Sequence, residues 1–128
     1  EQLTVFGGDY PTRDGSCIRD YIHVCDIAHA HTLAVQYLID KKNNSNCEIF
    51  NLGTGNGVSV LEAIQSFEKV AQQKLNYVVG NRRAGDVESI YANNGKANST
   101  LNWECKFSLD DAMLSAWKWE QKMKELNL

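Results

Sequence analysis

Short apolar stretches separated by glycine-rich turns predict several strands in this chain. Residues 3–6 are an apolar segment of strand length, and residues 48–52 and 75–79 are two further predicted strands. In residues 18–24, branched apolar side chains alternate with Arg19, Tyr21 and His23, a period of two that predicts a strand with one buried face. Arg19 and Tyr21 are therefore expected to project from the same face, and His23 is expected to have a structural role.

Segments with apolar residues three or four positions apart alternate with these strands. Residues 26–42 predict a helix with Asp26 as its N-cap. Ser59 and Glu62 have the spacing of a capping box, which predicts that a second helix begins there. The apolar face of that second helix is expected to consist of residues one turn apart, namely Leu61, Ile64, Phe67 and Ala71.

Two further helices are predicted near the end of the chain. Residues 94–101 form a short one, and Ser108 with Asp111 caps a final helix. The buried stripe of this final helix is expected to comprise Ala112, Met113, Ala116 and Trp117. The alternation of strands and helices predicts the α/β class.

Two loops carry the residues with the clearest binding chemistry. Residues 7–16 contain Gly-Gly, Tyr-Pro and Asp-Gly turn signals and are expected to face a ligand or partner. Residues 80–88 contain the pentad Arg-Arg-Ala-Gly-Asp at positions 82–86. Two arginines and a carboxylate beside a glycine can bind one phosphate and one vicinal diol. This combination suits a nucleotide sugar.

The composition is that of an ordinary globular domain. The 128 residues are 43% hydrophobic and 23% charged, which suits one domain with one core. The net charge of −3 argues against a nucleic-acid partner, so affinity for phosphate has to come from a few placed arginines. A strand-like segment starts at Leu3 in a chain that begins without methionine, so we expect this chain to be part of a longer protein.

The cysteines and the lengths of the apolar runs bear on the cellular compartment and on metal and membrane binding. Cys17, Cys25, Cys47 and Cys105 have irregular spacings, with no Cys-x-x-Cys pair and no clustered histidines, so no metal site is expected. We expect reduced thiols in a cytoplasmic protein, and a disulfide between Cys17 and Cys25 is the less favoured alternative. No apolar run approaches the roughly 20 residues that span a bilayer, so no membrane partner is expected.

Two motifs typical of dehydrogenases are not assigned a role in cofactor binding or catalysis. The Gly-x-Gly-x-Gly run at 53–57 follows a predicted strand, but the dinucleotide fingerprint requires glycine where Val58 stands. A tight turn that needs positive φ is the favoured interpretation. Tyr37 and Lys41 have Tyr-x-x-x-Lys spacing, but they lie at the end of a predicted helix beside a polar loop, which favours a surface helix end.

Several motifs together resemble one family. They are Val5-Phe6-Gly7 with Asp9-Tyr10-Pro11-Thr12, Arg19-Asp20-Tyr21-Ile22-His23-Val24 with Asp26, Asn51-Leu52-Gly53-Thr54-Gly55, the pentad at 82–86, and Leu101-Asn102-Trp103. Over nearly its whole length the chain resembles the carboxyl-terminal portion of the UDP-glucose 4-epimerases (UDP-galactose 4-epimerases), which are extended short-chain dehydrogenases/reductases. The resemblance implies a small mixed α/β substrate-binding domain, residues 1–128, with the Rossmann domain absent from this chain.

The resemblance also implies a division of labour with the missing amino-terminal domain. In this family that domain binds NAD and carries the catalytic Tyr-x-x-x-Lys pair, so this chain is expected to hold neither and to be inactive alone. The intact enzymes interconvert UDP-glucose and UDP-galactose by transient oxidation at C4, within galactose metabolism. They are commonly homodimers through the amino-terminal domain.

Matched position by position, the resemblance implies a UDP-sugar site. Phe6 would lie against uracil, and Tyr21 would line the nucleotide pocket. Arg19 and Arg83 would neutralise the diphosphate. Asp86 would accept hydrogen bonds from both ribose hydroxyls, as suits an ionised acceptor with two oxygens.

Ile90 stands where related epimerases carry residues of different size that help to decide whether an N-acetylated sugar fits. Its intermediate size predicts a preference for UDP-glucose and UDP-galactose and leaves UDP-N-acetylhexosamine undecided. Arg82 is either a solvated charge or a support for the site.

Two alternatives remain open for the function. One is the same region of another extended short-chain enzyme of nucleotide sugars, such as a dehydratase, decarboxylase or uronate epimerase, although the pentad at 82–86 favours the epimerases. The other is a free-standing module for nucleotide binding or protein interaction.

Overall fold

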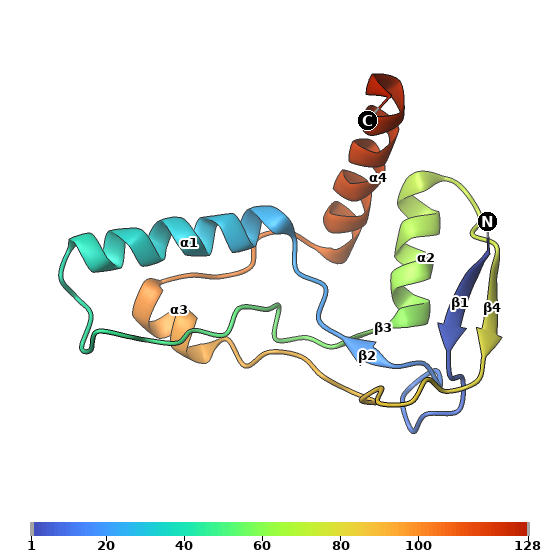
Figure 1. The fold of residues 1–128 in the computed structure, drawn as a ribbon, viewed down its shortest axis with the longest axis horizontal. Coiled ribbons are helices and arrows are strands. Elements are labelled where there is room, and N and C mark those ends of the chain that lie inside the picture. Colours follow the sequence, from blue (N-terminus) through green and yellow to red (C-terminus); the bar gives the residue numbers. More distant parts are fainter. Residues whose placement is uncertain (1, 128) are drawn as a thin grey trace.

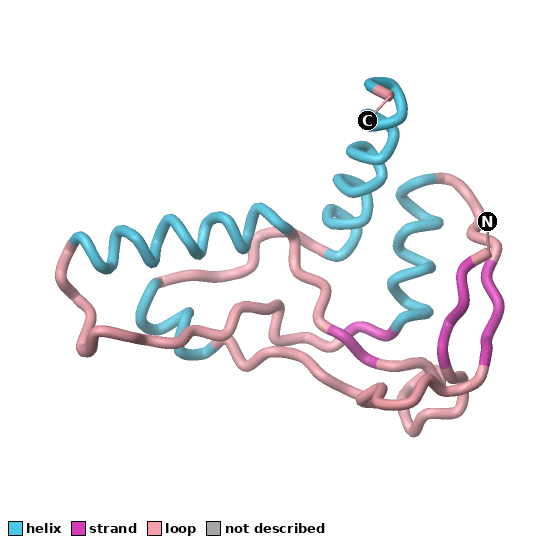
Figure 2. Tube along the Cα trace, in the orientation of Figure 1, coloured by secondary structure: helices cyan, strands magenta, loops and turns pink. Residues whose placement is uncertain are grey.

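The structure, a computed structural model, describes residues 2–127 and confirms the predicted α/β class (Figure 1). The elements in chain order are β1 (Leu3–Phe6), β2 (Ile18–Arg19), α1 (Val24–Ile39), β3 (Val58–Ser59), α2 (Val60–Ala71), β4 (Tyr77–Gly80), α3 (Gly95–Leu101) and α4 (Leu109–Leu126). Long loops join these elements (Figure 2). The strands are short and make up a small share of the described residues.

Each strand pairs with one other strand. β1 runs parallel to β4, with Leu3 opposite Tyr77 and Phe6 opposite Gly80. β2 runs antiparallel to β3, with Ile18 opposite Ser59. Because β3 leads directly into α2, the β2–β3 ladder brings the segment after loop 7–16 beside the start of that helix.

The helices gather at two ends of an elongated molecule (Figure 1). α1 and α3 lie at one end, α2 lies beside β1 and β4 at the other, and α4 packs on the side of α2 that faces α1. The rings of Phe67 and Trp117 meet edge to face across α2 and α4, with centroids 5.6 Å apart.

The main apolar core lies between α1 and α3. Its buried members are Ala30, Tyr37, Ala97, Leu101 and Trp103. Trp103 is fully buried, and its indole Nε1 donates a hydrogen bond of 2.9 Å to the backbone oxygen of Asp26. This bond ties the segment between α3 and α4 to the first turn of α1.

The start of α1 corrects two predictions. His23, not Asp26, is the N-cap, because its Nδ1 accepts the amide of Cys25 at 3.0 Å. Asp26 is buried, and its carboxylate instead accepts the amides of Lys106 and Phe107 at 3.1 and 3.3 Å. The strand predicted over residues 18–24 is limited to Ile18–Arg19, because its partner β3 is only two residues long, Val58–Ser59, before α2 begins.

Residues 48–52 form no strand in the described part of the chain, so that prediction was wrong. Phe50 and Leu52 pack against the core between α1 and α3, whereas Ile49 is 76% exposed. A strand needs a neighbour with which to exchange backbone hydrogen bonds, and residues 2–127 place none beside this segment.

The buried stripe predicted for the last helix is only partly formed. Ala112, Met113 and Trp117 are half-buried, but Ala116 is exposed and α4 has no fully buried residue. α2 is the main neighbour of α4, and one neighbouring helix covers only a narrow stripe.

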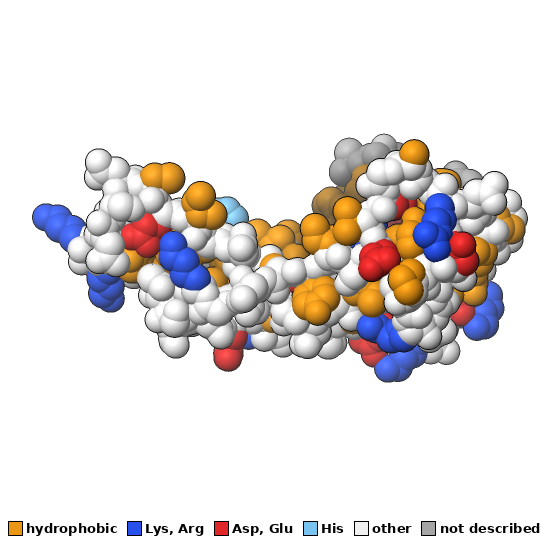
Figure 3. Space-filling view, turned by 90° about the horizontal axis from the view of Figure 1, so that it is seen from below, with side chains coloured by type: hydrophobic (Ala, Val, Ile, Leu, Met, Phe, Trp, Pro, Cys, Tyr) orange, Lys and Arg blue, Asp and Glu red, His pale blue; other side chains and the backbone are white. Residues whose placement is uncertain are grey.

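Several large apolar side chains reach the surface. On the β1–β4 sheet they are Leu3, Phe6, Tyr77, Val78 and Val79, and on α1 they are Val24, Val35, Leu38 and Ile39. Figure 3 shows hydrophobic side chains along the waist of the molecule and over the end that holds β1 and β4. Within residues 2–127, no helix combines the length and the apolar character needed to cross a membrane.

Candidate functional site

Loop 7–16 turns back on itself directly after β1. Gly7 has a φ of +82°, and a Cβ there would lie 2.3 Å from the ring of Tyr10, so both conformation and space require glycine. The amide of Tyr10 donates to the backbone oxygen of Gly15 at 3.0 Å and closes the loop. The loop therefore joins Phe6 at its start to β2 at its end by a fixed path.

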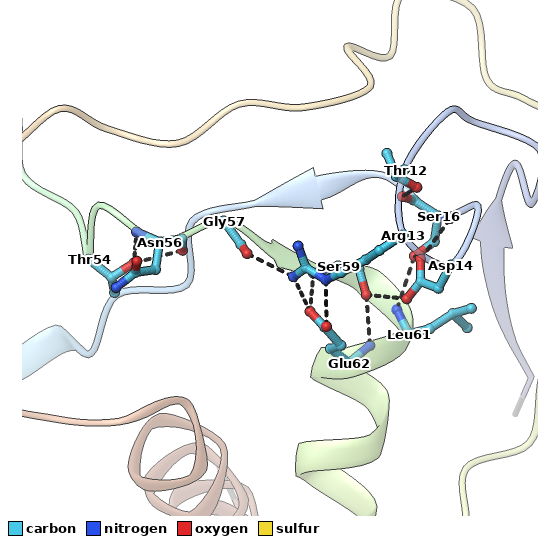
Figure 4. A network of polar contacts seen from close by, with 10 residues as sticks. All are labelled: Thr12, Arg13, Asp14, Ser16, Thr54, Asn56, Gly57, Ser59, Leu61 and Glu62. Carbon is cyan, nitrogen blue, oxygen red and sulfur yellow. Dashed lines mark hydrogen bonds and ion pairs between the residues drawn. The ribbon is translucent and has the colours of Figure 1, made fainter.

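A polar network that includes the buried side chains of Ser16 and Ser59 fastens this loop to the N-terminus of α2 (Figure 4). The Asp14 carboxylate accepts the amide of Ser16 at 3.0 Å, the hydroxyl of Ser16 at 2.8 Å and the hydroxyl of Ser59. Ser59 and Glu62 also form the predicted capping box of α2, which is confirmed. Burial acts to raise the pKa of Asp14, but the hydrogen bonds from Ser59 and Ser16 outweigh it and hold that pKa below its usual value.

Arg13 adds a second, exposed contact between the same two elements. Its guanidinium binds both oxygens of Glu62, with Nε 2.6 Å from Oε1, and donates to the backbone oxygen of Gly57 at 2.8 Å. This ion pair lowers the pKa of Glu62 and raises that of Arg13.

The β1–β4 register places the pentad at 82–86 beside Phe6. Phe6 lies opposite Gly80, so the chain that leaves β4 passes the end of β1. The Arg83 guanidinium lies 5.2 Å from the centroid of the Phe6 ring. Arg82 pairs with Asp9 at 2.8 Å and lies 4.2 Å from the centroid of the Tyr10 ring.

Asp86 joins Arg83 to Arg19. Its Oδ1 is 2.8 Å from Arg83 and 3.5 Å from Arg19, and the Asp86 side chain is only 11% exposed. Arg19 also donates to the backbone oxygen of Val87 at 2.7 Å, which fixes its direction. The hydrogen bond from Arg83 holds the pKa of Asp86 below its usual value.

The structure thus brings four of the six predicted site residues into one set of direct contacts. We call Phe6, Arg19, Arg83 and Asp86 the arginine–aspartate cluster. Tyr21 is half-buried, and this burial raises the pKa of its hydroxyl while the charge of Arg19 opposes the rise. Ile90 is held beside the cluster by its amide, which donates to the backbone oxygen of Ile18 at 3.1 Å, and its side chain is exposed.

The cluster offers two cations, one carboxylate and one aromatic face. Guanidinium groups bind phosphate oxygens in a fork geometry, and an ionised carboxylate accepts from paired hydroxyls. An aromatic ring next to a cation gives a flat base a surface on which to stack. Within residues 2–127, His, Cys, Asp and Glu side chains form no group of three that could hold a metal ion.

The residues of the glycine turn do not fit a dinucleotide. The turn leads into α2, whose first three amides already donate to the backbone oxygen of Cys17 and to the hydroxyls of Ser16 and Ser59. The carboxylates of Glu62 and Asp14 also lie at this N-terminus. Negative charge there opposes a phosphate. Tyr37 belongs to the buried core, so the surface position expected for it was wrong, whereas Lys41 is exposed beyond the end of α1.

Some residues of the site carry no clear signal in the sequence. The pairing of Arg82 with Asp9 and Tyr10 depends on the β1–β4 register, which spacing along the chain does not show. Asp20 is a second residue whose role the sequence does not show, because its carboxylate binds Thr54 and Ala92, which are both distant in the chain. Its place between Arg19 and Tyr21 is the one signal that marks it.

A family model described as GDP-mannose 4,6 dehydratase matches residues 1–115. The chain belongs to this family. The resemblance to UDP-glucose 4-epimerases is confirmed as well, because the chain is 47% identical over 120 residues to UDP-glucose 4-epimerase GEPI48 of Cyamopsis tetragonoloba. That alignment covers 94% of this chain and 34% of the relative.

Solved structures lead to the same group of proteins. A UDP-glucose 4-epimerase from Stenotrophomonas maltophila, with bound NAD and formylated UDP-arabinopyranose, is 42% identical and has a TM-score of 0.92 over 98% of this chain and 36% of its own. The Bifidobacterium longum enzyme, in complex with NAD+ and UDP, is 38% identical with a TM-score of 0.87 over 95% of this chain and 35% of its own. The chain therefore spans about a third of the length of these relatives.

Proposed function

We propose that residues 1–128 form the carboxyl-terminal, UDP-sugar-binding domain of a UDP-glucose 4-epimerase, an isomerase that interconverts UDP-glucose and UDP-galactose. The observation that carries this proposal is the arginine–aspartate cluster, in which β1, β2 and the loop after β4 bring two guanidinium groups to one carboxylate beside an aromatic ring. Relatives of the same name support it.

In this proposal each member of the cluster has one task. Arg19 and Arg83 bind the diphosphate, Asp86 accepts the ribose hydroxyls, and Phe6 lies against uracil. In the free chain Asp86 holds both arginines in place. When UDP binds, phosphate oxygens replace part of this pairing, so the guanidinium groups meet the ligand already oriented. Tyr21 and Ile90 line the site beside them.

Such an arrangement suits a sugar that has to turn over between two half-reactions. The nucleotide diphosphate is the constant part of both substrates and is anchored by charge-assisted hydrogen bonds, while the hexose remains free to present either face. The hydride chemistry at C4 and the binding of NAD belong to an amino-terminal domain outside this chain, because the glycine turn here does not fit the cofactor. The isolated chain is then inactive.

The remaining parts of the proposal concern the whole protein. We assign it to galactose metabolism and expect a homodimer assembled through the amino-terminal domain. All four cysteines are free thiols, which supports a cytoplasmic location.

The proposal is tested with the full-length protein that contains this chain. We expect it to convert UDP-galactose to UDP-glucose and to bind UDP. Arg83→Ala should weaken UDP binding by about tenfold or more, because a charge-assisted hydrogen bond to the diphosphate is lost. Arg82→Ala is the matched control, since this neighbouring arginine pairs with Asp9 and not with Asp86, and it should change UDP affinity by less than about threefold.

Three results would contradict the proposal. Equal losses in the Arg82 and Arg83 variants would mean that the cluster is not the diphosphate site. Turnover of another nucleotide sugar, with no epimerisation of UDP-galactose, would assign the chain to a dehydratase, decarboxylase or uronate epimerase of the same superfamily. Submicromolar UDP binding by residues 1–128 alone would favour a free-standing module, because a site built between two domains binds weakly when halved.

A further inference from the structure

The glycine turn at 53–57 packs closely against residues 90–94 of the same chain. A Cβ on Gly53 would lie 2.6 Å from the Ala92 side chain and 2.2 Å from Oδ2 of Asp20. A Cβ on Gly57 would lie 2.8 Å from the Tyr91 ring. Neither contact leaves room for a side chain, so these two glycines allow the later segment to approach the turn closely.

Hydrogen bonds from every second residue hold residues 90–94 against β2, against Asp20 and against the glycine turn. The amide of Ile90 donates to the backbone oxygen of Ile18 at 3.1 Å. The amide of Ala92 donates to Oδ2 of Asp20 at 3.0 Å, and Nδ2 of Asn94 donates to the backbone oxygen of Gly53 at 2.8 Å. Ile90 and the two residues that follow at every second position, Ala92 and Asn94, are thus each held by one hydrogen bond.

Asp20 is the side chain that links the two segments. Its other oxygen, Oδ1, accepts the amide of Thr54 at 2.9 Å and the hydroxyl of Thr54 at 2.7 Å. Burial acts to raise the pKa of Asp20, but the hydrogen bonds from Thr54 and Ala92 outweigh it and keep that pKa below its usual value. The carboxylate therefore stays ionised at neutral pH, and both of its oxygens already have protein partners.

We propose that Asp20 is a positioning residue that sets the place of Ile90 relative to Arg19 and thereby limits the size of the hexose that the site accepts. This inference rests on the proposed function, in which Arg19 binds the diphosphate and Ile90 lies at the sugar. Arg19 directly precedes Asp20 in the chain, and the Asp20 carboxylate binds the amide of Ala92, two residues after Ile90. One carboxylate therefore connects the proposed diphosphate-binding residue to the segment that carries Ile90. The glycine turn contacts both parts, because Thr54 binds Asp20 and the glycines at 53 and 57 lie against residues 92 and 91.

Asp20→Asn in the full-length protein tests the proposal. An asparagine that keeps its oxygen on the two Thr54 donors must direct its NH2 group at the amide of Ala92, where donor faces donor. Residues 90–92 then lose their central anchor and can move away from the turn. We expect kcat/KM for UDP-N-acetylgalactosamine, relative to UDP-galactose, to rise by about tenfold, which corresponds to about 1.4 kcal/mol. UDP affinity should change by less than about threefold.

Asp26→Asn is the matched control. Asp26 is also a carboxylate that accepts backbone amides, but its partners are the amides of Lys106 and Phe107 and not those of residues 90–94. The control should leave the ratio of the two sugars unchanged. Asn94→Ala is a milder second variant, which removes the bond to Gly53 and should shift the ratio in the same direction as Asp20→Asn.

Hydrogen exchange separates failure of this inference from failure of the proposed function. If the wild-type protein neither binds UDP nor epimerises UDP-galactose, the proposed function is wrong. Faster exchange of peptides covering 90–94 in Asp20→Asn, but not in Asp26→Asn, would still support the positioning role. An unchanged sugar ratio in an active Asp20→Asn protein, or unchanged exchange at 90–94, would overturn the inference.

Discussion

Replacement of Ser59 by alanine should destabilise α2 far more than replacement of Arg13, although Arg13 makes more hydrogen bonds in the structure. Ser59 is fully buried, caps α2 through the amide of Glu62 and donates to Asp14. Arg13 and Glu62 are paired on the surface, with 45% and 37% of their side chains exposed. Burial, and not the number of bonds, decides the expected effect.

The magnitude follows from the two interactions that Ser59→Ala removes. Loss of the N-cap costs about 1 kcal/mol. Loss of a hydrogen bond to a charged acceptor costs about 1.5 to 3 kcal/mol, and the lower part of this range applies because Asp14 is partly open to water. The total of about 2.5 to 3 kcal/mol corresponds to faster opening of α2 by about 70-fold to 160-fold. An exposed ion pair such as that of Arg13 changes opening by less than about fivefold.

Native-state hydrogen exchange of the full-length protein, followed by mass spectrometry on peptides covering α2, measures this opening directly. Peptides covering α1 serve as the internal reference, since α1 makes no hydrogen bond to this network among the described residues. Equal effects of Ser59→Ala and Arg13→Ala, or a larger effect of Arg13→Ala, would refute the argument from burial.

Three further predictions concern charge, pocket size and thiol reactivity. The pKa of Asp86 is lowered by Arg83, so its contribution is present above the ordinary aspartate pKa of about 3.9 and lost as pH falls through the lowered value. The ratio of UDP affinities of wild type and Asp86→Asn should therefore stay constant from about pH 8 to about pH 5 and approach one only below about pH 4. Ile90→Ala should gain activity on UDP-N-acetylhexosamines in a coupled assay, and no gain would count against its role in the pocket. Burial raises the pKa of Cys105 to about 11, so iodoacetamide at about pH 8 should label the exposed Cys25 well before Cys105, as read by mass spectrometry.

Features that depend on near neighbours in the sequence are the ones that could be predicted. The capping boxes at Ser59 and Ser108 are confirmed because both partners lie within one helical turn. The strand at 3–6 and the short helix near 94–101 are confirmed as well. The family motifs also named the members of the arginine–aspartate cluster, four of which the structure brings into contact.

Features that depend on distant segments could not be predicted. Residues 48–52 have the composition of a strand, but a strand also needs a partner, which residues 2–127 do not supply. Asp26 has the right residue type for an N-cap, yet the amides of Lys106 and Phe107 bind its carboxylate and His23 takes its place. The glycine run at 53–57 was expected to serve a turn with positive φ, which holds at Gly55. At positions 53 and 57 the requirement is space for residues 91 and 92.

A crystal structure of the full-length protein with UDP would test the central claim most directly. We expect the diphosphate between the guanidinium groups of Arg19 and Arg83, the ribose hydroxyls within hydrogen-bond distance of Asp86, and uracil against Phe6. UDP bound elsewhere, with Asp86 still paired to both arginines as in the free chain, would contradict the account.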